Sequence, residues 1–140
     1  MTRYIYSIMP VSSDSEYGQK RVRLNDAARD FDLAVHFPLD RGLPKEGMEF
    51  DLAAASTDIR QSVMVIADLT FERPSCYYEL GLAQALGARV SLIAKSGTPI
   101  HQAFGRNSVL EFRNLEDYTA VLGQILQTIQ LDPAENLAIK

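Results

Sequence analysis

Two carboxylates on either side of a short loop have the surroundings of a ligand site. Asp68 directly follows the apolar run 63–67, and Glu79 lies just inside the next apolar, helix-like stretch. A continuous apolar run is typical of a parallel strand buried on both faces, and open α/β sheets bind ligands at the carboxyl ends of such strands. We therefore expect Asp68 and Glu79 at that edge, where a carboxylate can act as a base, a nucleophile or an acceptor for a ligand hydroxyl group.

Each of these residues also has a structural interpretation. Glu79 in the first turn of a helix would complement the helix dipole, which would also depress the pKa of its carboxyl group. Asp68 could cap the loop through backbone hydrogen bonds, and Thr70 fits a turn. Cys76 is the only cysteine, which excludes an internal disulfide and a cysteine-based zinc site. A small buried thiol is the favoured interpretation of Cys76 over a nucleophile.

Composition narrows the class of protein. With 140 residues, 46% hydrophobic and 23% charged, the chain is expected to form one globular domain. The net charge of −4 argues against a nucleic-acid polymer as partner. The sequence starts directly in a strand-like pattern and lacks both a signal-peptide core and an apolar run of roughly 18 residues, so we expect a cytoplasmic protein without membrane contact. His36 and His101 are too isolated to predict a metal site.

Hydrophobic periodicity predicts alternating strands and helices. Strand-like patterns cover 4–9, 33–37, 63–67, 90–94 and 108–112, and helical patterns cover 16–29, 48–61, 74–88 and 115–129. This order predicts an α/β fold: a single-domain three-layer αβα sandwich with a mostly parallel five-stranded sheet, over residues 1–131, followed by a tail at 132–140.

The helices differ in how clearly they show a buried face. The helix over 115–129 has a strong apolar stripe, consisting of Leu115, Tyr118, Leu122, Ile125 and Ile129. The helix over 16–29 has a weak one, in which Val22, Ala27 and Ala28 are expected to face the core and Lys20, Arg21, Arg23 and Arg29 to face solvent. Gly87 is expected to end the helix that contains Glu79.

Four segments together resemble the nucleoside 2-deoxyribosyltransferase superfamily, which includes nucleotide N-glycosidases. They are Ile-Ala-Asp-Leu-Thr at 66–70, Tyr-Glu-Leu-Gly-Leu-Ala at 78–83, Ala-Leu-Gly at 85–87 and the strand at 90–94. The resemblance implies a flavodoxin-like, deoxyribosyltransferase-like fold and a homodimer or larger homo-oligomer. It also implies that Glu79 is the nucleophile, attacking the anomeric carbon of a sugar, and that Tyr6 on the first strand orients it.

The resemblance further suggests which residues contact the substrate and where this chain departs from the pattern. Ala55 stands where relatives carry an acid that assists the leaving base, so Asp58, or alternatively Asp51, is expected to substitute. The segment after the first strand contains no glycine, which leaves serine hydroxyls for a phosphate. The residues predicted to bind substrate are Asp68, Ser7, Ser12, Thr70 and Tyr78.

The resemblance leaves three functions open. The first is cleavage or transfer at the N-glycosidic bond of a nucleoside, nucleotide or related dinucleotide, which needs neither a metal nor an organic cofactor. The second, from a related resemblance to Toll/interleukin-receptor-like domains, is an NAD glycohydrolase or nucleotide-signal synthase of bacterial defence. The third is a nucleotide-sensing or interaction module without catalysis.

Overall fold

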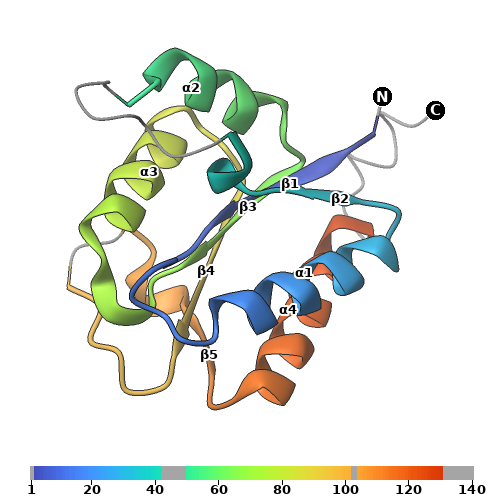
Figure 1. Ribbon diagram of the computed structural model, residues 1–140, viewed down its shortest axis with the longest axis vertical. Helices are drawn as coiled ribbons and strands as arrows, with labels where there is room; N and C mark the ends of the chain where they lie inside the picture. Colours follow the sequence, from blue (N-terminus) through green and yellow to red (C-terminus); the bar gives the residue numbers. More distant parts are fainter. Residues whose placement is uncertain (1, 42–49, 102–103, 131–140) are drawn as a thin grey trace.

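A computed structural model describes residues 2–41, 50–101 and 104–130 of the chain. Within these ranges five strands alternate with four helices, except that only a 3₁₀ turn lies between the last two strands (Figure 1). The strands are β1 (Tyr4–Ile8), β2 (Ala34–His36), β3 (Met64–Asp68), β4 (Val90–Lys95) and β5 (Leu110–Phe112). The helices are α1 (Tyr17–Arg29), α2 (Leu52–Gln61), α3 (Pro74–Ala85) and α4 (Leu115–Gln130), joined by short 3₁₀ turns at Pro38–Arg41, Thr70–Glu72 and Arg106–Ser108.

The strands form one parallel sheet in the order β2-β1-β3-β4-β5. Chain order reverses between β1 and β3, which is the switch point at which doubly wound sheets bind ligands. β3 lies at the centre and every one of its residues is buried, as its continuous apolar run predicts. In the pairing of β1 with β2, Tyr6 is opposite His36.

Helices cover both faces of the sheet (Figure 1). α1 and α4 pack on one face, where the core contains Ile5, Ile66 and Leu122. α2 and α3 cover the other face, where the core contains Tyr6, Val65 and Leu80. Because neighbouring strand residues point to opposite faces, residues next to each other in β1 or β3 belong to different layers. The predicted αβα sandwich is thus confirmed.

Local sequence explains where the helices begin and end. The side chain of Asp51 accepts a hydrogen bond from the Ala54 N–H and caps α2. Pro74 occupies the first turn of α3, where its missing N–H costs nothing. After α3 the chain turns at Gly87, which has φ of +73°, so the predicted stop at this glycine is confirmed. The last helical residue is Ala85, three residues before the end of the predicted range 74–88.

Some predicted boundaries differ from the structure. The strand predicted over 108–112 begins only at Leu110, because the preceding residues form a 3₁₀ turn. The start of the helix predicted over 48–61, and the tail at 132–140, lie outside the described residues. In the parts of the chain that are described, no helix has the length and apolarity to cross a bilayer.

Two side chains of α1 lie on the opposite side from the one that the sequence predicts. Lys20 was expected to face solvent but is only 1% exposed, while Val22, expected in the core, is 59% exposed. The buried face of α1 consists of Lys20, Leu24 and Ala28. A charged residue thus occupies a core position, which periodicity of apolar residues does not reveal.

Candidate active site

Glu79 and Tyr6 form the centre of the candidate site. The Tyr6 hydroxyl donates a hydrogen bond of 2.9 Å to Glu79 Oε2. Tyr6 comes from β1 and is 1% exposed, whereas Glu79 comes from the second turn of α3 and is partly exposed. The strand and the helix are each fixed by the core on this face of the sheet, so the donor and the acceptor are both held in place.

The surroundings of Glu79 raise the pKa of its carboxyl group. Burial has the larger effect and disfavours the charged form, while the hydrogen bond from Tyr6 acts in the opposite direction. The expectation that the helix dipole depresses this pKa is therefore wrong, because desolvation outweighs the stabilising contacts of the anion. A partly desolvated carboxylate with one firm hydrogen bond is well suited to nucleophilic or acid–base chemistry.

His36 and Asp58 lie behind Tyr6. The His36 ring stacks on the Tyr6 ring with the centroids 5.3 Å apart and the planes at 28°. Its Nε2 is shielded from solvent and lies 3.3 Å from Asp58 Oδ2. Periodicity does not group His36 with Tyr6, because only the pairing register of β1 and β2 brings them together.

Asp68 and Glu79 have different hydrogen-bond partners, although both are expected at one edge of the sheet. Asp68 Oδ2 accepts a hydrogen bond of 2.8 Å from Lys20 Nζ, and its Oδ1 accepts bonds from the Thr70 N–H and hydroxyl. Lys20 belongs to α1, so this carboxylate points to the α1/α4 layer, whereas Glu79 lies in the α2/α3 layer. The reason is the alternation of side chains along β3, which directs Asp68 away from α3.

Lys20, Asp14 and Asp68 form a buried cluster that sequence reasoning missed. Lys20 Nζ also bonds Asp14 Oδ2 at 2.6 Å, and it lies over the rings of Phe112 and Tyr118 at 4.9 and 5.7 Å from their centroids. Burial lowers the pKa of the Lys20 ammonium, but Asp68 and Asp14 raise it by more, so the net shift is upward. The cluster ties α1 and the loop after β1 to the end of β3.

The other residues predicted to bind substrate differ in their accessibility. Thr70 is buried, bonding Asp68 and accepting a hydrogen bond from the Lys95 N–H. Ser7 is 2% exposed, in a strand position that alternates with Tyr6 and so belongs to the opposite face. Ser12 is exposed in the loop after β1. Of the five residues predicted to bind substrate, only Ser12 and one further residue have an exposed side chain.

That further residue is Tyr78, which is 57% exposed and precedes Glu79 on α3. Its ring meets Phe50 edge-on, with the centroids 5.5 Å apart. Phe50 stands just before α2 and is 44% exposed, so two aromatic rings bridge the beginnings of α2 and α3 at the surface. The sequence indicated Tyr78 but gave no signal for Phe50.

Cys76 has the environment of an unreactive thiol. It is 2% exposed, and burial together with the negative charges of Glu79 and Asp68 raises its pKa to about 12. A thiol with this pKa carries almost no thiolate at neutral pH, so it is a poor nucleophile. The interpretation of Cys76 as a small buried core residue is confirmed.

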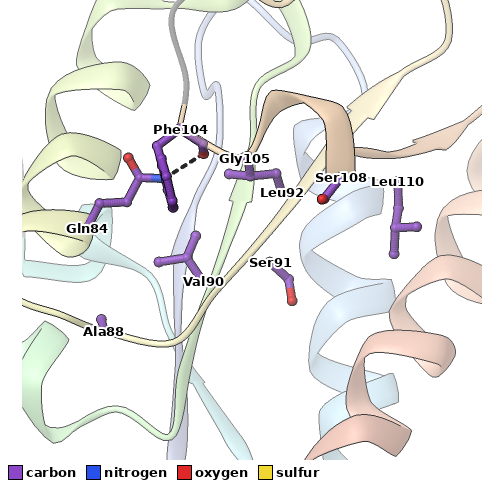
Figure 2. Close-up of a pocket in the computed structure, with 9 residues that line it drawn as sticks. All are labelled: Gln84, Ala88, Val90, Ser91, Leu92, Phe104, Gly105, Ser108 and Leu110. Carbon is purple, nitrogen blue, oxygen red and sulfur yellow. Dashed lines mark hydrogen bonds between the residues drawn. The ribbon is translucent and has the colours of Figure 1, made fainter.

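Two surface pockets lie away from the bond between Tyr6 and Glu79. The larger, of about 450 Å³, is beside β4 and β5. There the exposed Phe104 ring lies next to Gln84 of α3, and the Gln84 side-chain N–H donates a hydrogen bond to the Phe104 carbonyl (Figure 2). The smaller, of about 350 Å³, lies past the ends of β3 and β4 and includes Glu72 and Lys95. Glu79 lines neither pocket. In the described ranges no group of three or more His, Cys, Asp or Glu residues is arranged to hold a metal ion.

Comparison with known proteins identifies the fold. No family model and no curated protein matches the sequence. The structure matches a 2-deoxyribosyltransferase from Bacillus psychrosaccharolyticus with a TM-score of 0.61 and 20% identity, over 85% of this chain and 95% of that one. It matches the CMP N-glycosidase BcmB of Clostridium botulinum with a TM-score of 0.62 and 13% identity, over 87% and 99%. The chain has the deoxyribosyltransferase fold.

The deoxyribosyltransferase fold confirms the architecture that the sequence predicts. At these identities the likeness concerns the backbone, so the roles of Glu79, Tyr6 and Asp58 depend on the contacts of this chain. Those contacts show Glu79 with Tyr6, and Asp58 with His36. The His36 ring contacts both of the other two groups, stacking on Tyr6 and lying 3.3 Å from Asp58 through Nε2.

Proposed function

We propose that this protein cleaves or transfers the N-glycosidic bond of a nucleoside, nucleotide or related dinucleotide, with Glu79 as nucleophile. The hydrogen bond of 2.9 Å between the Tyr6 hydroxyl and Glu79 Oε2 carries the proposal. Two proteins of the same fold, named as a 2-deoxyribosyltransferase and a CMP N-glycosidase, support this class of reaction.

The reaction proceeds in two steps. The free Glu79 oxygen attacks the anomeric carbon while the bond to the base breaks, and the bonding electron pair leaves with the base, which takes up a proton. Water or a second base then attacks the same carbon and releases the Glu79 carboxylate. The Tyr6 hydroxyl fixes the carboxylate for attack, because covalent catalysis needs the reacting atoms at near-contact distance and in line.

Two exposed residues of the predicted set supply the remaining assignments. Ser12 and Tyr78 are proposed to contact substrate, since both are exposed near the loops that precede α1 and α3. Exposed aromatic rings such as Tyr78 bind flat groups well, because they bury area at low entropic cost. Asp68, Ser7 and Thr70 are proposed to support the loops, in keeping with their burial.

The proposal is tested by incubating the protein with nucleosides, their 5′-monophosphates and NAD in parallel, and measuring free base by chromatography. We expect one class to release base and Glu79→Gln to abolish the release. Glu116→Gln is the matched control, because Glu116 is exposed on α4 on the opposite face of the sheet. A glycosyl adduct on Glu79, trapped with a slow 2′-fluoro substrate and found by intact mass, would identify the nucleophile.

Three outcomes would change the assignment. Release of nicotinamide from NAD alone would favour the glycohydrolase or signal-synthase function. Binding of nucleotides without any turnover would favour the sensing module. Full activity in Glu79→Gln would show that Glu79 is not the nucleophile.

A further inference from the structure

The Tyr6 side chain is held at two places. Its hydroxyl donates to Glu79, and one face of its ring stacks on His36. The hydroxyl oxygen is rigidly attached to the ring, so any tilt of the ring moves the donor relative to Glu79. Since a hydrogen bond weakens steeply with distance and angle, whatever fixes the plane of the Tyr6 ring also fixes this bond.

His36 is itself fixed from neighbouring elements. Its backbone is opposite Tyr6 in the pairing of β2 with β1, and its Nε2 lies 3.3 Å from Asp58 Oδ2 of α2. The Tyr4 hydroxyl donates a bond of 2.6 Å to the Asp58 carbonyl, which ties that turn of α2 to β1. The His36 and Asp58 side chains are only 23% and 14% exposed, so the array is largely shielded from water.

We propose that His36 is a positioning residue, which Asp58 holds against the Tyr6 ring so that the Tyr6 hydroxyl stays aimed at Glu79. The proposal rests on the proposed function of Glu79. It gives Asp58 a role through His36 instead of direct contact with the leaving base. Functional groups need to be held to within about 0.5 Å, and a stacked ring backed by the neighbouring Asp58 carboxylate supplies such a restraint.

A double-mutant cycle tests this role in catalysis. We expect His36→Ala to lower kcat about tenfold and to leave KM within about twofold, because the loss concerns alignment and not binding. In a Tyr6→Phe background, His36→Ala is expected to have no further effect, since the hydroxyl it positions is gone. His36→Phe keeps a flat ring against Tyr6 and is expected to recover at least half of the lost rate.

A second readout needs no turnover. The Tyr6 hydrogen bond lowers the pKa of Glu79 against the larger effect of burial, so weakening that bond raises this pKa further. We expect carboxyl-carbon NMR to show an upward pKa shift in His36→Ala as in Tyr6→Phe, with no added shift in the double variant. The neighbouring Cys76 thiol, with a pKa of about 12, stays neutral through the titration.

The control is His101→Ala, since His101 is the only other histidine and its exposed side chain pairs with Glu72. It is expected to change neither kcat nor the Glu79 pKa. The proposal is overturned if His36→Ala lowers the rate equally in the Tyr6→Phe background, or if it leaves the Glu79 pKa unchanged. If no substrate is turned over, the proposed function fails while the NMR titration still decides the role of His36.

Discussion

Replacing Lys20 by Met is expected to cost a large share of the stability of this domain. The ammonium group bonds Asp14 Oδ2 and Asp68 Oδ2 at 2.6 and 2.8 Å, and the three side chains are 1%, 4% and 3% exposed. Methionine fills similar space with an unbranched apolar chain, so the change removes the charge with little loss of volume. It leaves two carboxylates buried without their shared cation.

The size of the effect follows from this geometry. Removing one partner of a buried ion pair costs about 3–5 kcal/mol, because the remaining charge stays buried and uncompensated. Asp68 keeps its bonds from Thr70, and Asp14 keeps a bond from the Glu16 N–H, so each carboxylate retains part of its solvation. We therefore expect a loss of about 3–5 kcal/mol, equivalent to a fall in Tm of roughly 12–20 °C for a domain of this length.

Urea unfolding followed by circular dichroism measures this loss. Lys95→Met is the matched control, because Lys95 is half-exposed and only 3.5 Å from Glu16, so its removal should change stability by less than about 0.5 kcal/mol. A loss below about 1 kcal/mol at pH 7 would refute the reasoning.

Three further expectations concern α3. Burial raises the pKa of Glu79, so the contribution of this carboxyl group to stability is largest below its unfolded pKa and is lost as pH rises through its folded pKa. Glu79→Gln should therefore raise the free energy of unfolding at pH 7, with the gain absent near pH 4, as measured by thermal unfolding. The Cys76 thiol, with a pKa of about 12, should resist iodoacetamide at pH 8 in the native protein and react once urea unfolds it, as measured by mass. Gly87→Ala should lower the free energy of unfolding by about 1 kcal/mol, because φ is +73° there. Gly81→Ala, inside the helix, should raise the free energy of unfolding by about 0.5–1 kcal/mol. Both positions have open space for a methyl group.

The fold could be predicted because its signals are local. The apolar run before Asp68 identifies a buried strand, the stripe of α4 identifies its buried face, and Gly87 marks the end of α3. Each depends on residues near one another in sequence, so periodicity and turn chemistry are sufficient. Lys20 shows the limit of that reasoning, because a buried lysine becomes favourable only when Asp14 and Asp68 approach it from elsewhere in the chain.

The site is harder to predict because it depends on which face of the sheet each residue occupies. Asp68 and Glu79 both follow the same strand in sequence, yet their side chains bond to partners in different layers. A one-residue change of position along a strand reverses the direction of a side chain. The same alternation that turns Asp68 toward Lys20 turns Tyr6 toward α3, and the pairing of β1 with β2 then adds His36. A sequence identifies the carboxylate, whereas the residues that contact it are set by the register of the strands, which only the assembled sheet defines.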